Sequence, residues 1–587
     1  MKRLLFGLCL FMTVSAAWAS KVLTGPQIVR QPDGTELTVF AHGDEHFSWY
    51  TAKDGALLAH VGTTFYVARI DAQGQLTPTD IVAHNPWRRS DNERIAVKAQ
   101  QPLQAAFLAQ AQERVANGIA QRVSIGRSSH YFPHVGSPKA MVILVNFADT
   151  TFSVADPVKT FNQYLNSDSA QIDLGNREDR NHGSVRKYFS DMSFGQFTPQ
   201  FDIKGPVTLS HGLAYYGSDE GGRDKRFAEM ITEACTLIDD TVNFADYDQD
   251  GDGLVDLVYI IYPGYSQSLS QNSTDCLWPK SGAQNLGSYD GVQVYRYGIN
   301  NELNAYPGAF SRPPYKQING IGLFVHEFSH TMGLPDLYPT RSTAQIDNQA
   351  MEYWDVMDGG EYLNNGWRPT PYTPWERETM GWMTIDTLDK AQMVKLAPIE
   401  FGGKAYKILT GTPNEYLIVE NIQQAGWNRS QKGHGMIVYR VDYPYSTVNL
   451  GDYPNNTAGK PALTIVPADG LLLTSYRING TTVTQDDYYN SMAGDPFPGT
   501  SNVSSLESVV LNESTLTDKP LYDITETPDG YITFKFIDSS ITDDIQTTST
   551  DKPASDVYSI DGRYMGNTLQ GLQKGIYIIG GKKMVVK

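Results

Sequence analysis

The stretch that decides the fold is Ile321-Gly-Leu-Phe-Val-His326-Glu327-Phe-Ser-His330-Thr-Met-Gly333-Leu-Pro-Asp336. Residues four apart share one face of an α-helix, so His326 and His330 can direct both imidazoles at one ion. Neutral imidazole is a preferred ligand of Zn²⁺. Glu327 lies next to the pair, where its carboxylate can take a proton from a metal-bound water. The motif therefore predicts a zinc site on a helix that is buried beneath a cleft.

A third metal ligand is expected downstream of the helix. Gly333 follows His330 by three residues, where a helix can end in a left-handed residue, and Asp336 then follows on the reversed chain. The rival is Glu376, in a segment that starts like a helix with Thr373 and Pro374. The spacing favours Asp336, and Glu376 remains open as the alternative.

A methionine turn is predicted in Tyr353-Trp-Asp-Val-Met357-Asp-Gly-Gly360. In metzincin-type proteases a turn of this kind forms a hydrophobic base under the metal. The competing interpretation is that both histidines are ordinary core residues. Met357 argues against that interpretation.

A calcium-type loop is predicted where carboxylates cluster before an apolar run. Asp248, Asp250, Asp252 and Asp256 occupy positions 1, 3, 5 and 9 of an EF-hand-like loop, with glycine at position 6. Position 12 is Tyr259 rather than the usual glutamate, so a bound Ca²⁺ would be held by a shortened loop. The alternative is an aspartate-rich turn without an ion.

The N-terminus has the pattern of a signal peptide. Lys2 and Arg3 precede a short apolar run, and Ala17-Trp-Ala19 supplies a cleavage pattern, so the mature chain is expected to begin near Ser20. No later stretch reaches the roughly 20 apolar residues of a membrane helix.

The net charge of −18 argues against a nucleic-acid partner, because phosphate binding needs a basic surface. Outside the signal, Cys235 and Cys276 form either one disulfide or two buried thiols.

The rest of the chain shows several regions of different pattern. Continuous apolar runs at 140–147 and 254–262 indicate strands buried on both faces, and 225–238 and 103–120 have helical patterns. From residue 396 the signals are short β runs between turns. The predicted boundaries are a signal peptide at 1–19, a propeptide at 20–127 with a cleavable stretch at 127–130, a catalytic domain at 128–395, a β-rich domain at 396–540, a linker at 541–555 and a short C-terminal β element at 556–587.

Several separated segments resemble the immune inhibitor A family of secreted bacterial metalloproteases. Beside the histidine motif they are Val142-Ile-Leu-Val-Asn-Phe147, the aspartate loop leading into Tyr262-Pro-Gly-Tyr265, Leu277-Trp-Pro279, Trp354-Asp-Val-Met357, Trp375-Glu-Arg377, Gly381-Trp382, Gly435-Met-Ile-Val-Tyr439 and Gly494-Asp-Pro-Phe-Pro-Gly499. The resemblance implies a zincin-like catalytic domain, a removable propeptide, structural calcium and a downstream β domain. It also implies zinc bound by His326 and His330, with Glu327 as the base. Asp358 departs from the small hydroxyl residue expected after the turn methionine.

The expectation is therefore an α+β multidomain protein: a zincin-like metalloprotease domain followed by an all-β, sandwich-like domain. It would be a secreted zymogen that hydrolyses peptide bonds of extracellular proteins and uses Zn²⁺ for catalysis and Ca²⁺ for structure. The alternatives are a non-enzymatic surface protein, which would have no use for Glu327, and a metal hydrolase of another bond. Residues 557–579 resemble C-terminal sorting elements of exported bacterial proteins, so free secretion and surface attachment both stay open.

Overall fold

The computed structural model describes most of the chain in two compact units, Met1–Ile537 and Asp538–Lys587. The described residues are 16–19, 26–44, 47–61, 64–71, 74–120, 131–167, 181–219, 224–268, 276–304, 317–345, 351–412, 414–443, 448, 452–541, 557–559, 564–566, 575–579 and 582–586. The predicted charged start and apolar run of the signal peptide, the cleavable stretch at 127–130 and nearly all of the linker at 541–555 lie outside them. Among the helices described, none has the length and apolarity needed to cross a membrane.

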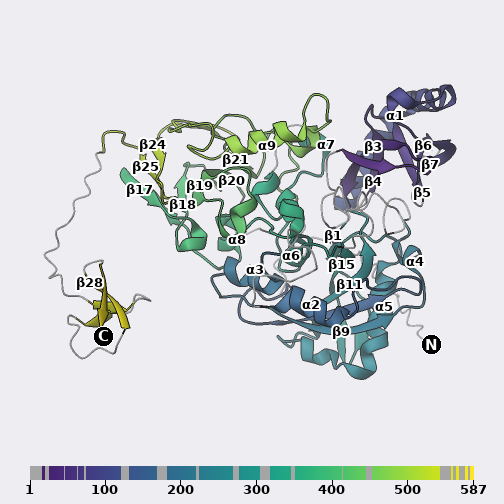
Figure 1. Cartoon of the computed structure of the whole chain (residues 1–587), viewed down its shortest axis with the longest axis horizontal. Helices are drawn as coiled ribbons and strands as arrows, with labels where there is room; N and C mark the ends of the chain where they lie inside the picture. Colours follow the sequence, from purple (N-terminus) through teal and green to yellow (C-terminus); the bar gives the residue numbers. More distant parts are fainter. Residues whose placement is uncertain are drawn as a thin grey trace, which may run out of the picture. The chain divides into compact units, whose positions relative to one another are not determined.

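A six-stranded sheet with the order β1-β12-β15-β11-β8-β9 is built mainly from residues 131–383 of the predicted catalytic domain, called the catalytic region below (Figure 1). Strands β15, β11, β8 and β9 are parallel, whereas β12 pairs antiparallel with β15, and β1 pairs antiparallel with β12. The strands are β1 (Ala16–Ala19), β8 (Lys139–Asn146), β9 (Gln200–Thr208), β11 (Val258–Tyr265), β12 (Lys280–Ala283) and β15 (Arg296–Leu303).

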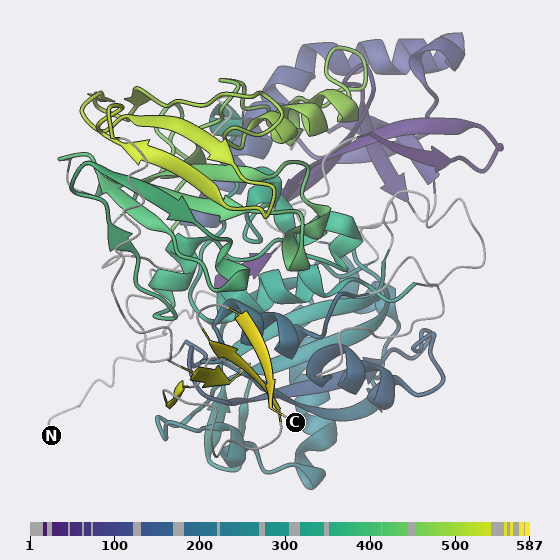
Figure 2. The same cartoon turned by 60° about the vertical axis from the view of Figure 1, so that its left-hand side comes forward.

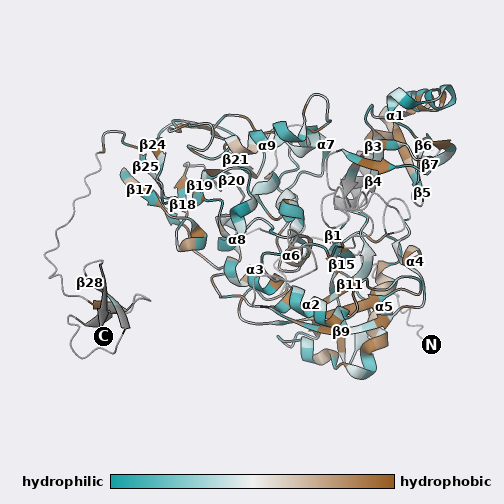
Figure 3. Cartoon of the chain, viewed as in Figure 1, coloured by the Kyte–Doolittle hydropathy of each residue, from teal (hydrophilic) through white to brown (hydrophobic). Residues whose placement is uncertain are grey.

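Helices cover both faces of this sheet, which explains the continuous apolar run at 140–147. Val142 and Leu144 belong to one core, which they share with α2 (Pro157–Asn166), α3 (Val185–Met192) and α6 (Ile321–Thr331). Met141 and Ile143 face the other core, which α5 (Phe227–Ile238) closes. The hydrophobic colouring in Figure 3 follows α5 and the strands beside it.

The predicted strand at 254–262 is wrong as a single element. Leu254–Val255 forms β10 in a small sheet with β14 (Val292–Val294) and β13 (Ser288–Tyr289), and β11 starts only at Val258. The break falls at Asp256, whose amide donates to the carbonyl of Tyr247 at 2.8 Å and whose carboxylate accepts from Gln249. The chain leaves one sheet there and enters the next.

The N-terminal region is an antiparallel meander of six strands with one long helix, α1 (Asp91–Ala120). The helix begins twelve residues before the predicted start at 103, because Ser90 accepts the amide of Glu93 and the acidic first turn suits a helix N-terminus. Trp278 of the catalytic region belongs to the apolar core of this meander. The strands are β2 (Gln27–Arg30), β3 (Glu36–Asp44), β4 (Phe47–Ala52), β5 (Leu57–Val61), β6 (Thr64–Ile70) and β7 (Leu76–Val82).

Beyond the catalytic region, two sheets pack on a shared apolar core, seen as two layers in Figure 2. The five-stranded sheet has the order β16-β18-β19-β20-β21, and the three-stranded sheet has the order β17-β25-β24. Their strands are β16 (Asp386–Thr387), β17 (Gln392–Leu396), β18 (Tyr406–Leu409), β19 (Glu415–Ile422), β20 (Gly435–Asp442), β21 (Leu463–Ile465), β24 (Leu521–Glu526) and β25 (Ile532–Phe536). Helix α9 (Gln485–Gly494) and the hairpin of β22 (Val509–Val510) with β23 (Thr515–Leu516) complete the region.

The other face of the five-stranded sheet packs on the catalytic region. Ile418, Ile437 and Tyr439 lie in the same core cluster as α6. In the C-terminal unit, β26 (Val557–Ser559), β27 (Tyr564–Gly566), β28 (Gly575–Ile579) and β29 (Lys582–Val586) form one four-stranded antiparallel sheet.

Candidate metal centre

Helix α6 is buried along its whole length, and two glycines allow its close packing. A Cβ at Gly322 would lie 1.9 Å from the carbonyl oxygen of Glu361, and one at Gly320 would lie 2.1 Å from the carbonyl carbon of Gly366. Both neighbours are backbone atoms, which cannot swing aside as a side chain could. The segment after the methionine turn therefore lies directly against the start of the helix.

The two histidines of α6 are oriented by backbone carbonyls. His326 donates from Nδ1 to Val356 O at 2.9 Å, and His330 donates from Nδ1 to Leu334 O at 2.8 Å. A carbonyl oxygen only accepts, so Nδ1 of each ring carries a hydrogen and Nε2 is the ring nitrogen that can bind a metal. The two Nε2 atoms face one another at 3.2 Å.

Asp336 completes a group of three ligand-type atoms. Its Oδ1 lies 3.3 Å from His326 Nε2 and 3.1 Å from His330 Nε2, and all three side chains are buried. Burial opposes ionisation of Asp336, whereas His330 and His326, when protonated, lower the pKa of that carboxyl. Three atoms that carry lone pairs repel one another at this separation unless a cation lies between them. Tetrahedral ligands at about 2.0–2.1 Å from zinc lie about 3.3–3.4 Å apart, so this donor set fits zinc.

Glu376 lies elsewhere and serves its own helix, α8 (Pro374–Thr379). It forms a capping box with Thr373, in which the carboxylate accepts from the Thr373 amide at 2.7 Å and from the hydroxyl at 3.0 Å. The buried group of His326, His330 and Asp336 does not include it. In this geometry Asp336, and not the alternative Glu376, accompanies the histidines.

Glu327 is fully buried in α6 beside this group. It lies close enough to Tyr259 of β11 that its charge, together with burial as the larger cause, raises the pKa of that phenol. Glu327 is adjacent in sequence to His326, and its carboxylate is not among the three converging atoms.

The methionine turn lies under the same group. Met357 is buried, and its carbonyl accepts the amide of Leu337, the residue after Asp336, at 2.9 Å. Asp358 caps the turn: Oδ2 accepts from the amides of Met351 and Glu352, and Oδ1 accepts from Gly359. This gives a structural role to the aspartate where a small hydroxyl residue was expected.

The aspartate loop brings three of its four predicted carboxylates together: Asp248, Asp250 and Asp256. Asp252 instead accepts the amide of Leu254 through Oδ1 at 2.8 Å, which closes a local turn. Burial raises the pKa of Asp256 to about 6, with the charges of Asp250 and Asp248 as smaller causes. A divalent cation bound here would relieve this repulsion.

Cys235 and Cys276 are both buried free thiols. The first lies in α5, and the second lies just before β12. The disulfide left open from the sequence is absent from the structure.

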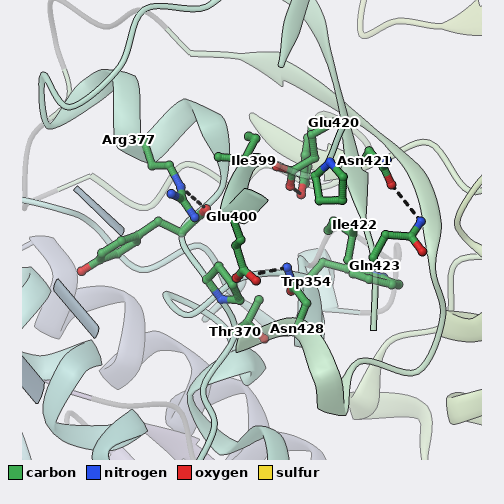
Figure 4. A pocket seen from close by; sticks show the side chains of 14 residues that line it. Trp354, Thr370, Arg377, Ile399, Glu400, Glu420, Asn421, Ile422, Gln423 and Asn428 are labelled. Atoms are coloured by element: carbon green, nitrogen blue, oxygen red, sulfur yellow. Dashed lines mark hydrogen bonds between the residues drawn. The ribbon is translucent and has the colours of Figure 1, made fainter. Parts of the chain in front are cut away.

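Sequence reasoning missed the residues that hold the centre from outside the catalytic region. Glu352 accepts from the Ser475 amide at 3.1 Å and from the Tyr488 hydroxyl at 2.7 Å. A small polar cavity also lies at this boundary, lined by Trp354, Arg377, Glu400, Glu420 and Asn428 among others (Figure 4). These contacts join residues more than 100 positions apart, and sequence spacing does not predict contacts over such separations. The burial of the polar side chains in the structure is what identifies them.

Comparison with known proteins shows which family the chain is similar to. A family model described as immune inhibitor A peptidase M6, catalytic domain, matches residues 129–383. The pre-pro-metalloprotease PrtV of Vibrio cholerae is 25% identical over 216 residues, which cover 33% of this chain and 23% of the relative. Immune inhibitor A of Bacillus thuringiensis subsp. alesti is 24% identical over 320 residues, which cover 46% of this chain and 44% of the relative. The chain thus spans less than half the length of these curated relatives. Residues 129–383 are therefore similar to the catalytic domain of the immune inhibitor A peptidase M6 family.

Proposed function

We propose that the chain is a secreted zinc-dependent endopeptidase, made as a precursor, that hydrolyses peptide bonds of extracellular proteins. The observation that carries the proposal is the convergence of His326 Nε2, His330 Nε2 and Asp336 Oδ1 beside Glu327 on a buried helix. The family of residues 129–383 supports the reaction class. The names of the relatives, a metalloprotease and immune inhibitor A, agree with it.

In this proposal each residue has one task. His326, His330 and Asp336 hold zinc, which when bound supplies Lewis acidity to water and to the scissile carbonyl. Glu327 takes the proton of the attacking water and passes it to the leaving amine. Met357 packs beneath the ligands, and the carbonyls of Val356 and Leu334 fix the tautomer of each imidazole.

The edge of the sheet at strand β12 supports a polypeptide substrate. Residues 16–19 pair antiparallel with β12 over Ala16 to Ala283 and Ala19 to Lys280, so this edge accepts an extended chain through backbone hydrogen bonds. Residues 16–19 would leave with the signal peptide. A substrate can then take the same edge beside α6.

The precursor form is supported by the burial of the centre. Glu327 and the three ligand candidates are at most 1% exposed in the full-length chain, as expected of a latent precursor. We infer that residues 20–127 are a propeptide and that their removal opens the cleft. Trp278, in the core of the N-terminal meander, lies two residues before β12 and connects this region to the cleft edge.

Calcium at Asp248, Asp250 and Asp256 is a structural part of the proposal. These oxygen donors lie just before β11, so an ion there would stabilise the sheet and take no part in the chemistry. Attachment to the cell surface through the C-terminal unit is the alternative to free secretion.

The decisive test compares Glu327→Ala with the processed wild type for casein hydrolysis and zinc content. We expect loss of hydrolysis with equal zinc, because Glu327 is not among the converging ligand atoms. The exposed Glu507→Ala is the matched control. Equal hydrolysis by Glu327→Ala would refute its role. A wild type that binds zinc but cleaves nothing after removal of its N-terminal region would favour a non-enzymatic binding protein.

A further inference from the structure

Residues 131–134, the first described residues after the predicted propeptide, cross the C-terminal end of helix α6. The amide of Phe132 donates to the carbonyl of Thr331 at 2.9 Å. His134 donates from Nε2 to the carbonyl of Met332 at 2.6 Å, since a carbonyl can only accept. The last carbonyls of a helix have no partner within it, so these two bonds satisfy groups that the helix leaves open.

The same helix end orients His330. Its Nδ1 donates to Leu334 O at 2.8 Å, and the Leu334 amide donates back to Ser329 O at 3.3 Å. Thr331 and Met332 lie between these residues. A shift of their carbonyls would therefore move the acceptor that fixes the His330 ring.

Side chains hold the segment firmly in place. Phe132 is fully buried and packs against Phe328 of α6, with ring centroids 5.1 Å apart. The Tyr131 ring covers Gly333, where a Cβ would lie 3.0 Å from the ring and φ is +102°. The carbonyl of His134 accepts from the Trp382 indole at 2.7 Å, which connects the segment to the chain after α8.

We propose that residues 131–134 are a positioning segment for the metal ligand His330 and that the maturation cut falls before Phe132. The proposal rests on the proposed function for the identity of the metal. The positioning itself concerns this chain's own residues. A cut after Phe132 would remove both the buried Phe132 ring and its amide, which donates to the end of helix α6. The mature protein would then lose contacts that keep the His330 ring in its orientation.

The test uses the full-length protein and the variants His134→Ala and His134→Gln, with the exposed His211→Ala as matched control. Glutamine keeps a donor near the position of Nε2. Zinc affinity is measured by competition with a chelator, and amide hydrogen exchange of residues 328–334 is measured on metal-free protein. We expect His134→Ala to weaken zinc binding about tenfold or more and to speed exchange at the helix end. We expect His134→Gln and His211→Ala to stay close to wild type.

Unchanged zinc affinity and unchanged exchange in His134→Ala would overturn the positioning role. If that variant does not fold, His134→Asn against His134→Gln gives the comparison, because asparagine is too short to reach Met332. Mass spectrometry of the mature chain checks the cut, and an N-terminus beyond Phe132 would contradict the proposal. A wild type that binds no zinc would refute the proposed function, while the exchange measurement would still decide whether the segment holds the helix end.

Discussion

The Trp354 indole donates to the carboxylate of Asp495 at 2.7 Å, across 141 residues of sequence. Trp354 lies three residues before the turn methionine, and Asp495 follows helix α9 in the region beyond the catalytic domain. Tyr353 is tied to the same region, because its carbonyl accepts from Gln431 at 2.8 Å. The predicted methionine turn is therefore held partly by residues outside the matched segment 129–383.

Replacing Asp495 with alanine tests this connection. The change leaves the buried Trp354 N–H without its acceptor, which costs about 1–3 kcal/mol in the free energy of unfolding. Asp495→Asn keeps an oxygen acceptor and should cost less. Urea denaturation measures both, with the exposed Asp389→Ala as control. Asp495→Ala as stable as this control would mean that the bond contributes nothing.

The sequence predicted which nearby side chains of the candidate centre converge, for a physical reason. His326, Glu327 and His330 lie within one helix turn and a half, where spacing alone determines which side chains share a face. Asp336 was predicted because a helix end and a short reversal also depend on neighbouring residues. The contacts of Asp495, Ser475 and Tyr488 depend instead on how separate regions pack, and no periodicity encodes that.

The sequence indicated that these helices and strands exist, but it did not predict correctly where each of them begins and ends. The run at 254–262 is apolar throughout, but the chain changes sheets at Asp256 because that residue serves the aspartate loop. At this position the aspartate belongs to the candidate ion site, and the strand that the apolar pattern predicted is therefore interrupted. The long helix likewise begins at Asp91 because Ser90 caps it, a signal that the apolar pattern does not contain.

The choice of third ligand is testable by substitution. Asp336→Ala removes an atom 3.1–3.3 Å from both histidine nitrogens, so we expect zinc affinity to fall by about 100-fold or more. Glu376→Gln should leave zinc stoichiometry at one per chain, because Glu376 caps its own helix. Atomic absorption after dialysis against dilute chelator distinguishes the two. Zinc lost from Glu376→Gln and retained in Asp336→Ala would reverse the assignment.

Removal of calcium should lower thermal stability without changing zinc content. Three carboxylates converge at Asp248, Asp250 and Asp256, so their mutual repulsion is larger without a cation than with one. At a calcium concentration 100 times the dissociation constant, binding contributes about 2.7 kcal/mol to stability. We expect the melting temperature of the wild type to rise with calcium and that of Asp248→Asn to respond much less. Magnesium is the control cation, and a wild-type melting temperature indifferent to calcium would argue for a turn without an ion.

Stability should also fall as pH rises through neutrality, because of Glu420 in the cavity of Figure 4. Burial raises the pKa of Glu420 from 4.5 to about 7, while the Tyr439 hydroxyl bond and the charge of Arg377 act in the opposite direction. The folded state therefore holds a proton that the unfolded state has released. This stabilisation is complete below about pH 4.5 and is lost as pH passes 7, a change of about 3 kcal/mol.

Glu420→Gln removes the titration and keeps an oxygen that can accept from Tyr439. We expect the variant to lose less stability than the wild type between pH 4.5 and pH 8. Urea denaturation of metal-free protein at both pH values makes the comparison, since the absence of metal removes the pH dependence of metal binding. The exposed Glu507→Gln should behave as the wild type does. Identical pH dependence in Glu420→Gln and wild type would show that Glu420 ionises in the folded protein at the ordinary pH of a glutamate.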